Sequence, residues 1–559
     1  MRHGGTLLVE ALKAQGVDRV YCIPGESYLA ALDGLYESGI ETVVARQEGG
    51  AAMMAEADGK LTGRPGVAFV TRGPGATNAS SGVHVAFQDS TPLVLFVGQV
   101  ASDQKDREAF QEVDYRAMFG PLAKWVAEVE RADRLPEYVS HAFHVAQSGR
   151  PGPVVLALPE DMLSAPVLGV EAGGPVAVPA AVLPAGAASE AEIAGILARL
   201  EAAERPFVIA GGGGWSAEAA EALGRFAETL QLPVGVSFRC QDYLDNAHPC
   251  YAGDVGIAPN PALAARVREA DVLLVLGARL GEMTTSGYTL ITPPVPRQGV
   301  LHVHPDTSEL GRVYRPDMAI AARAGVVVCQ LAEAAQQGRS KAPSEERAAV
   351  LREVRRSYEA WQVPEPTTGA LRMEAVIAHL REVLPEDAIV TNGAGNYAGW
   401  LHRYYRWRRW RTQLAPTSGS MGYGLPAAVA AKLRHRDREV ICLAGDGCFQ
   451  MVCQELGTAA QYGAGIVVLI SNNGMYGTIR MHQERHYPGR PSGTAMRNPD
   501  FAALARAYGG TGLTVERDAD VAAALAEARA AAARDAMPAV IELKVAPEAI
   551  SPKMVLGRR

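Results

Sequence analysis

Two short apolar runs, and the residues that end them, constrain this chain more than any other feature. Residues 440–444 form an apolar run that ends at Gly445-Asp446-Gly447, and residues 466–470 form a second run that is followed by Asn472-Asn473. Residues 449–462 between them have helix length, so the segment predicts a strand, a helix and a strand. Such a connection is a right-handed crossover between parallel strands, whose carboxyl ends share one edge of the sheet. The acidic and amide side chains that follow the two runs should therefore be near neighbours.

These polar side chains match the ligands of a magnesium ion. Mg²⁺ takes about six oxygen ligands, of which one or two are carboxylates and the others are amide oxygens, waters and phosphates. Asp446 supplies a carboxylate, Asn473 supplies an amide oxygen, and the backbone carbonyl of Met475 can reach the same ion. Gly445 and Gly447 let the backbone approach a phosphate, and the helix that follows offers free N–H groups. Each half alone is typical of an ordinary turn, but the two together predict a magnesium diphosphate site.

Further short motifs occur in order along nearly the whole chain. These motifs are Ile23-Pro24-Gly25, Arg46-Gln47-Glu48-Gly49-Gly50-Ala51, Gly73-Pro74-Gly75-Ala76-Thr77-Asn78, Asp89-Ser90-Thr91-Pro92, Gly98-Gln99-Val100, Ala109-Phe110-Gln111-Glu112, Gly152-Pro153-Val154, Gly277-Ala278-Arg279 and Ser420-Met421-Gly422-Tyr423-Gly424-Leu425-Pro426-Ala427-Ala428. With the segment above, this series resembles the thiamine diphosphate-dependent enzymes, and among them the acetolactate synthase (acetohydroxyacid synthase) large subunits. The resemblance implies thiamine diphosphate and Mg²⁺ as cofactors and 2-oxo acids as substrates.

The resemblance also implies roles for three side chains. Glu48 would hydrogen-bond N1′ of the pyrimidine ring, whereas from its position alone it reads as a carboxylate favoured by a helix dipole. Gln111 would lie in the substrate cleft with Phe110 as an apolar wall, and both can instead be packing residues of a loop. Met421 would separate the two rings of the cofactor, although methionine is also a common core filler. We take Glu48 and Gln111 as the candidate catalytic residues.

A second phosphate loop is expected after the apolar run at 388–390. Gly393-Ala394-Gly395 resembles this loop, but Asn396-Tyr397 stand where the family usually has Gln-His, so the contacts of these two side chains stay open. The full set of residues expected to bind the cofactor is Gly25, Glu48, Gly393, Gly395, Asn396, Tyr397, Gly419, Met421, Gly445, Asp446, Gly447, Cys448, Asn473 and Met475.

Length and composition indicate a globular protein with several domains. The chain has 559 residues, of which 48% are hydrophobic and 21% charged, which suits about three to four domains. A net charge of −7 gives no reason to expect nucleic acid or an anionic membrane as a partner. The seven cysteines form no metal-type pairs, and no apolar signal core or membrane-length span occurs. We therefore expect a cytoplasmic location.

Two shifts in composition divide the chain into three α/β units. Residues 164–190 read as an extended linker, and residues 336–368 as a charged connection with some helix. We expect doubly wound parallel sheets in a pyrimidine-binding domain at 1–165, a central domain at 190–337 and a diphosphate-binding domain at 370–550. Three central strands, at 207–210, 272–276 and 300–303, end in glycine or polar turns. This pattern is equally typical of an FAD site and of an empty domain, so FAD stays open.

One local exception to the acidic composition is a strip of basic and aromatic residues at 403–411. An isolated strip of this kind more often packs at a domain or subunit boundary than binds nucleic acid. We expect packing.

Three departures from the family pattern concern the substrate. Glu160 reverses the charge of the lysine in the usual Leu-Pro-Lys-Asp segment, residues 281–283 lack the usual Asp-Asp-Arg, and His482 stands near the usual pocket tryptophan. Arg480 or His482 would then have to compensate, because a buried carboxylate needs paired charge or several donors.

The leading functional hypothesis is a carboligase or lyase that acts on 2-oxo acids and makes 2-acetolactate from pyruvate. A simple 2-oxo acid decarboxylase or another C–C lyase with the same cofactor is the alternative. A binding protein without turnover is disfavoured because Glu48, Asp446 and Asn473 are all present, and a dehydrogenase is disfavoured because residues 211–214 lack the dinucleotide fingerprint. The family implies a homodimer or homotetramer in which Glu48 of one chain faces the diphosphate held by a second chain.

Overall fold

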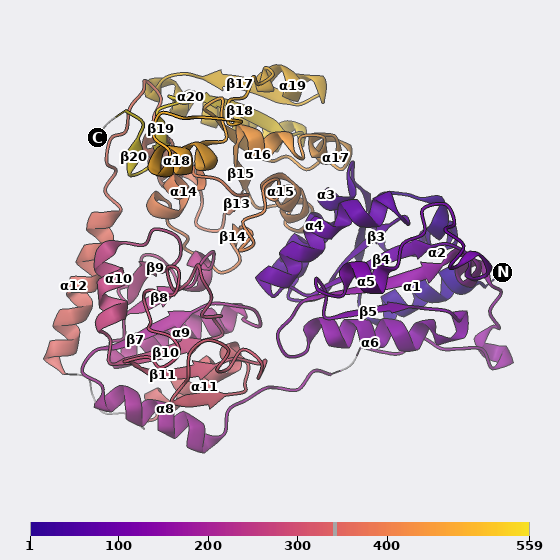
Figure 1. The fold of residues 1–559 in the computed structure, drawn as a ribbon, viewed down its shortest axis with the longest axis horizontal. Helices are drawn as coiled ribbons and strands as arrows, with labels where there is room; N and C mark the ends of the chain where they lie inside the picture. Colours follow the sequence, from indigo (N-terminus) through magenta and orange to yellow (C-terminus); the bar gives the residue numbers. More distant parts are fainter. Residues whose placement is uncertain (1, 181, 339–343, 558–559) are drawn as a thin grey trace. The chain divides into compact units, whose positions relative to one another are not determined.

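The computed structural model describes residues 2–180, 182–338 and 344–557 and contains three six-stranded sheets (Figure 1). Their strand orders are β2-β1-β3-β4-β6-β5, β12-β11-β10-β7-β8-β9 and β14-β13-β15-β16-β18-β17. The strands pair in parallel in all three sheets, and sequential strands that are not neighbours are joined by crossovers. The predicted doubly wound α/β fold is confirmed.

The first sheet is covered on both faces by helices of the N-terminal part. Its strands are β1 (Arg19–Cys22), β2 (Glu41–Val44), β3 (Gly66–Val70), β4 (Leu93–Gln99), β5 (Trp125–Glu128) and β6 (Pro153–Pro159), and its helices are α1 (Gly4–Ala14), α2 (Leu29–Leu35), α3 (Glu48–Thr62), α4 (Pro74–Asp89), α5 (Tyr115–Phe119), α6 (Leu135–Gln147) and α7 (Glu160–Ser164). Helices α1 and α6 pack on the face that carries Phe69 and Phe96, and α3 and α4 lie on the other face (Figure 1). This double cover explains the continuous apolar strands.

The second sheet is built in the same way. Its strands are β7 (Pro206–Ala210), β8 (Val234–Val236), β9 (Tyr251–Asp254), β10 (Val272–Leu276), β11 (Gly299–Val303) and β12 (Met318–Ile320). Helices α8 (Glu190–Ala202), α9 (Ala217–Leu230) and α11 (Ala324–Gln336) share one core with it, and α10 (Pro261–Glu269) and α12 (Glu345–Trp361) contribute to another. The three predicted central strands are thus confirmed as β7, β10 and β11.

The third sheet contains the two apolar runs at 440–444 and 466–470. Its strands are β13 (Ile389–Asn392), β14 (Gln413–Leu414), β15 (Val440–Gly445), β16 (Val467–Asn472), β17 (Thr511–Val515) and β18 (Ala539–Lys544). The remaining helices are α13 (Met373–Val383), α14 (Ala398–Tyr404), α15 (Gly424–Arg434), α18 (Gly477–His486), α19 (Phe501–Ala507) and α20 (Val521–Asp535), and β19 (Ala549–Ser551) and β20 (Met554–Val555) form a separate antiparallel pair. Strands β15 and β16 pair in parallel, with Gly445 opposite Ser471, so their carboxyl ends meet as the crossover predicts.

The single helix expected at 449–462 is wrong. The structure has two short helices there, α16 (Asp446–Gln450) and α17 (Glu455–Gln461). Between residues 449 and 457 the backbone hydrogen bonds join residues three apart instead of four, which tightens the chain and breaks the helix. The first of the two helices therefore begins at Asp446 itself.

The contacts of the described residues define two compact units. One comprises residues 1–183, 391–395 and 416–547, and the other comprises residues 184–390, 396–415 and 548–559. The basic aromatic strip at 403–411 belongs to the second unit, where Tyr404 and Trp407 are buried and the Trp407 carbonyl accepts a hydrogen bond from the Asn246 N–H at 2.9 Å. The aromatic side chains of the strip therefore pack in the interior of that unit.

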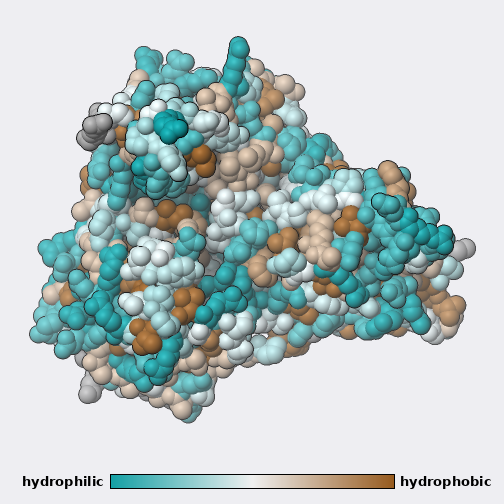
Figure 2. Space-filling view, in the orientation of Figure 1, coloured by the Kyte–Doolittle hydropathy of each residue, from teal (hydrophilic) through white to brown (hydrophobic). Residues whose placement is uncertain are grey.

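None of the described helices is long and apolar enough to cross a lipid bilayer. Figure 2 shows hydrophilic side chains over most of the visible face, with hydrophobic ones in small separate groups. All seven cysteines are free thiols, and five of them are buried.

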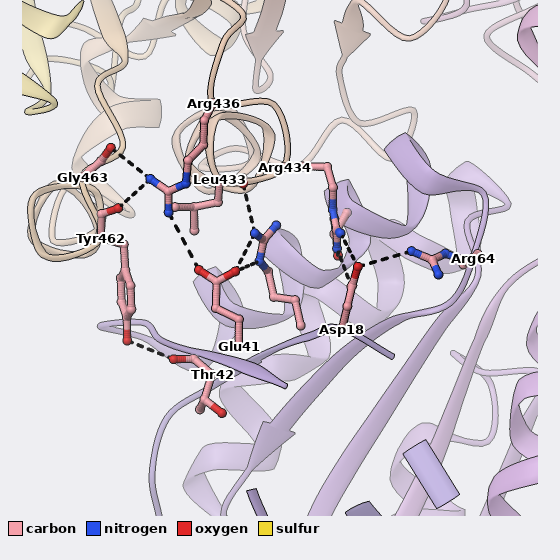
Figure 3. Close-up of polar contacts among 11 residues, drawn as sticks. Asp18, Glu41, Thr42, Arg64, Leu433, Arg434, Arg436, Tyr462 and Gly463 are labelled. Carbon is pink, nitrogen blue, oxygen red and sulfur yellow. Dashed lines mark hydrogen bonds and ion pairs between the residues drawn. The ribbon is translucent and has the colours of Figure 1, made fainter. Parts of the chain in front are cut away.

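Within the first unit, opposite charges fasten the end of α15 to the amino-terminal edge of the first sheet (Figure 3). Arg434 lies between two acids, with Nη1 2.8 Å from Asp18 Oδ2 and Nη2 2.6 Å from Asp58 Oδ2. Beside it, Arg19 pairs with Glu41 at 2.6 Å. Burial works to raise the pKa of Asp18, but the hydrogen bond and charge of Arg434 outweigh it and lower that pKa below its ordinary value.

Replacing Arg434 should destabilise the first unit. Arg434→Met leaves the buried Asp58 carboxylate unpaired, so we expect the free energy of unfolding to fall by about 3 kcal/mol at neutral pH. The share due to Asp18 is present above its ordinary pKa of 3.8 and is lost as the pH falls through the lower pKa of the folded state. Denaturant unfolding at neutral and acid pH should therefore show a difference from the wild type that shrinks in acid.

Arg436→Met is the matched control. Arg436 follows the same helix end, but it is half exposed and lies 3.8 Å from Glu41. An equal loss of stability in the two variants would show that Arg434 has no special role.

Candidate active site

Glu48 stands at the carboxyl edge of the first sheet. Strand β2 ends at Val44 and α3 begins at Glu48, with the Gln47 side chain accepting a hydrogen bond from the Gly50 N–H at 2.9 Å. Glu48 Oε2 in turn accepts a hydrogen bond from Asn78 Nδ2 at 2.9 Å. Its side chain is half-buried. The carboxyl group is therefore oriented by α4 and remains accessible to a ligand.

The loop before Glu48 rests on a buried acid from α17. The Glu455 carboxylate accepts hydrogen bonds from the Arg46 N–H at 3.2 and 3.3 Å and from the Thr458 hydroxyl at 2.6 Å. A Cβ at Gly50 would lie 2.5 Å from Glu455 Oε1, so this approach requires glycine. Burial raises the pKa of Glu455 above its ordinary value, although these donors favour the charged form.

Two other predicted residues lie at the same edge of the sheet. A Cβ at Gly25 would lie 2.3 Å from Thr71 Cβ, so glycine allows the segment after β1 to touch the segment after β3. Gln111 has a left-handed backbone with φ +66°, and a Cβ at Gly73 would lie 2.7 Å from its Cβ. The structure thus brings the segments of Gly25, Glu48 and Gln111 to the carboxyl ends of neighbouring strands.

The Gly445-Asp446-Gly447 motif places a buried carboxylate where β15 and β16 end. Asp446 Oδ1 accepts a hydrogen bond from the Gly447 N–H at 2.9 Å, and Oδ2 accepts one from the Gly474 N–H at 2.8 Å. Asn473 Oδ1 accepts a hydrogen bond from the Met475 N–H at 3.2 Å. Burial raises the pKa of Asp446, against the hydrogen bonds that favour its charged form.

This donor set fits magnesium. Among the described residues, no group of three or more His, Cys, Asp or Glu side chains could hold a metal ion. The partners of the buried Asp446 are N–H donors, and none of the ion pairs found among the described residues neutralises it. One carboxylate with a neighbouring amide and carbonyl suits an ion that takes its remaining ligands from phosphates and water.

Asn498 is a site residue that sequence reasoning missed. Its Nδ2 donates hydrogen bonds to Asp446 Oδ2 at 2.7 Å and to Asn472 Oδ1 at 2.8 Å, and its Oδ1 accepts one from Gln450 Nε2 at 2.9 Å. Asn472 also donates to Glu542 Oε1 at 2.6 Å, so its amide is occupied within the sheet. Asn498 precedes a proline and the cap of α19, and that local pattern predicts only a helix start.

The loop at 417–423 carries the residues expected beside the pyrimidine ring. Gly419 is exposed with φ +68°, and Met421 is half-buried. The Gly422 N–H donates to Cys448 Sγ at 3.1 Å, which ties the loop to α16. Ser418 Oγ and, at the end of β13, Asn392 Oδ1 are buried and find no hydrogen-bond partner among the described residues. Such orphaned polar atoms fit a site that completes its hydrogen bonds with a ligand.

Buried charges on α3 and α4 hold both ends of this loop. Asp89 Oδ1 accepts a hydrogen bond from the Thr417 N–H at 2.7 Å, and the Tyr423 hydroxyl donates to Glu56 Oε2 at 2.5 Å. Lys60 joins the two acids by ion pairs. Burial alone would lower the pKa of Lys60, but the carboxylates of Asp89 and Glu56 raise it above its ordinary value.

The remaining expected residues belong to the segment after β13. Gly393 directly follows the strand and is buried, and Gly395 has φ +147°, a conformation open to glycine. Asn396 and Tyr397 fall in the second compact unit, where Tyr397 is buried just before α14.

Comparisons with known proteins agree with this geometry. Residues 2–118 match the thiamine pyrophosphate enzyme N-terminal TPP binding domain, residues 193–331 the central domain, and residues 393–543 the C-terminal TPP binding domain. The acetolactate synthase large subunit of Parasynechococcus marenigrum is 34% identical over 93% of this chain and 85% of that protein. The isozyme 3 large subunit of Escherichia coli is 33% identical over 94% and 92%, and the large subunit of Lactococcus lactis 31% over 90% and 87%.

The chain therefore belongs to the thiamine pyrophosphate-dependent enzymes. Within that family it is an enzyme of the acetolactate synthase type, since these relatives align with it over nearly its whole length. Both steps confirm the resemblance expected from the motifs.

Removing the Asn498 side chain should weaken metal binding without unfolding the protein. Residues that orient a metal ligand typically contribute about 10-fold to 100-fold to metal affinity, and we expect a loss in this range for Asn498→Ala. Calorimetric titration with Mg²⁺ in the presence of thiamine diphosphate measures it. Asn260→Ala is the control. It removes the asparagine that caps α10 beside the second sheet and should leave the Mg²⁺ affinity unchanged. Equal affinities for Asn498→Ala and the wild type would contradict the assigned contact.

Proposed function

We propose that the chain is a thiamine diphosphate- and Mg²⁺-dependent carboligase of 2-oxo acids that converts two pyruvate ions and a proton into 2-acetolactate and CO₂. The observation that carries this proposal is the buried Asp446 carboxylate at the joint ends of β15 and β16, in a chain similar over nine tenths of its length to acetolactate synthase large subunits. The domain bounds we propose are 1–165, 190–337 and 370–550.

The metal would be held by Asp446, Asn473 and the carbonyl of Met475, and the diphosphate by backbone groups around Gly445 and Gly447. The other proposed contacts of the coenzyme are Gly25, Gly393, Gly395, Asn396, Tyr397, Gly419, Met421 and Cys448. When bound, thiamine diphosphate supplies the nucleophilic carbon and the electron sink for decarboxylation. The buried Ser418 and Asn392 oxygens would supply further hydrogen-bonding groups to this ligand.

Glu48 would hold or release a proton at its carboxyl oxygens, opposite N1′ of the pyrimidine ring. Its hydrogen bond from Asn78 fixes the carboxyl group, and the Glu455 support fixes the loop before it. Such fixed geometry is what a proton-transferring side chain requires. Gln111 would supply an amide to the substrate.

Arg480 is the side chain we propose for the substrate carboxylate. Its Nη2 pairs with Glu484 at 2.9 Å, while its buried Nη1 has no hydrogen-bond partner in the part of the chain that the structure describes. His482 is exposed and stacks against His486 instead. The reversed charge at Glu160 keeps a simple 2-oxo acid decarboxylase, or another lyase with the same cofactor, as the second candidate.

Coenzyme binding and product analysis test this function. We expect the wild type to take up thiamine diphosphate only with Mg²⁺ in calorimetry and to form 2-acetolactate from pyruvate. Asp446→Asn should lose this uptake, because a neutral amide binds Mg²⁺ far more weakly than a carboxylate. Asp437→Asn, in the turn before β15, is the control. Release of free acetaldehyde without acetolactate would favour the decarboxylase, and a wild type that takes up no coenzyme would reject both.

We further propose a homo-oligomer, dimer or tetramer, in which Glu48 of one chain serves the diphosphate held by a second copy. This proposal rests on the family resemblance, which implies that the two cofactor-binding halves come from different chains. Mixing inactive Glu48→Gln and Asp446→Ala variants should restore roughly a quarter of wild-type activity, because half of the dimers are hybrids and each hybrid keeps one intact site. An absence of recovery despite demonstrated subunit exchange would argue against shared sites.

A cytoplasmic location completes the proposal, and the seven free cysteines suit it. FAD in the central domain stays a prediction that mass spectrometry of small molecules released from the native protein will test.

A further inference from the structure

Arg72 connects three segments at the carboxyl edge of the first sheet. It follows β3, and only 8% of its surface is exposed. Its Nη1 donates to Glu160 Oε2 at the start of α7 at 2.9 Å, and its Nε donates to the carbonyl oxygen of Phe110 at 3.2 Å. Glu26, in the segment after β1, lies 3.9 Å from Nη2. The planar guanidinium of Arg72 therefore connects the loop at Phe110, the start of α7 and the segment after β1.

The contact with Phe110 lies next to a strained residue. Gln111 has φ +66°, a backbone conformation that is unfavourable for a residue other than glycine and persists only where the surroundings impose it. The loop supplies part of that constraint itself, because the Glu112 carboxylate accepts two backbone hydrogen bonds at 2.7 and 3.0 Å. The rest comes from outside, because Arg72 binds the preceding carbonyl and Gly73 packs directly against Gln111.

The ion pair of Arg72 also accounts for the reversed charge at Glu160. The family resemblance expects a lysine at that position, and here the acid is matched by the arginine across the edge of the sheet. Glu26 lies beside the same guanidinium, so Arg72 faces two carboxylates and this part of the cleft edge presents no excess of positive charge to a substrate. Breaking the pair with Glu160 would leave the guanidinium without its hydrogen-bonded carboxylate, and it would no longer be oriented toward Phe110.

We propose that Arg72 is a positioning residue of the substrate cleft, where its guanidinium, oriented by Glu160, holds the backbone at Phe110 and Gln111 in the conformation that the reaction uses. The inference rests on the proposed function, because the role of Gln111 comes from the family resemblance. Arg72 acts through Gln111, so its loss should affect substrate use and leave coenzyme binding intact.

The first sheet provides a matched control pair for the experiment. Arg19 and Glu41 pair at 2.6 Å with side-chain exposures of 8% and 39%, close to the 10% and 37% of Arg72 and Glu160. This control pair lies at the opposite, amino-terminal edge of the same sheet, where β1 and β2 begin. The variants are Arg72→Met, Arg72→Lys and Glu160→Gln, with Arg19→Met and Glu41→Gln as controls. For each full-length protein we would measure the melting temperature, the Kd of thiamine diphosphate with Mg²⁺, and kcat and KM for pyruvate.

Arg72→Met and Arg19→Met should lower the melting temperature alike. Only Arg72→Met should also lower kcat/KM, on the order of 100-fold as for other misplaced groups, while the coenzyme Kd stays within about twofold of the wild type. Glu160→Gln should show a smaller loss in the same direction. Arg72→Lys should fall between the wild type and Arg72→Met, because an ammonium keeps the charge but lacks the planar fork that serves both partners.

The inference is overturned if Arg72→Met keeps the kcat/KM of Arg19→Met, or if coenzyme affinity falls in parallel with kcat/KM. Failure of the proposed function has a different signature, namely a wild type that binds the coenzyme but converts no pyruvate. In that case the same comparison is made with the 2-oxo acid from which the wild type releases CO₂, and a kcat/KM equal to that of the control still rejects the role of Arg72.

Discussion

The buried carboxylate of Asp446 is the interaction on which the rest of this structure depends. It lies where β15 and β16 end together, and burial disfavours its charged form. Three N–H donors compensate part of that cost, and a divalent ion with a phosphorylated ligand can compensate the remainder. Three features place this one charge. They are the parallel crossover, the glycines beside Asp446, and Asn498, which precedes α19.

Helix α3 of the first unit carries Glu48 and also contacts the loop at 417–423. Its Glu56 accepts a hydrogen bond from Tyr423 at the end of the loop that carries Met421, and Lys60 pairs with Glu56 and with Asp89, which holds the other end of that loop. Farther along, Asp58 binds Arg434 at the end of α15. These charges are buried in matched groups, so losing one partner leaves an uncompensated charge. Stability of the unit and alignment of the site therefore depend on the same helix.

The features that define the cofactor and those that select the substrate lie in different kinds of structure. The residues that we propose for the metal and the diphosphate follow the ends of buried strands, where topology dictates position. The departures from the family pattern lie in loops and short helix starts at the sheet edge, such as Glu160 with its partner Arg72 and the residues around Arg480. Loops tolerate such change because they carry little of the core, so one scaffold can serve several 2-oxo acid reactions.

The sequence by itself determined the strands at 440–445 and 467–472 and the meeting of their ends, because apolar runs, glycines and the handedness of crossovers are local or topological rules. It misjudged the helix at 449–462, where backbone hydrogen bonds between residues three apart separate α16 from α17. Only the tertiary structure showed that Asn498 contacts Asp446, 52 positions away in the sequence. The same holds for Glu160 and Arg72, which are 88 positions apart. Patterns along a chain encode periodicity and turns, whereas contacts between distant side chains arise only when packing brings their segments together.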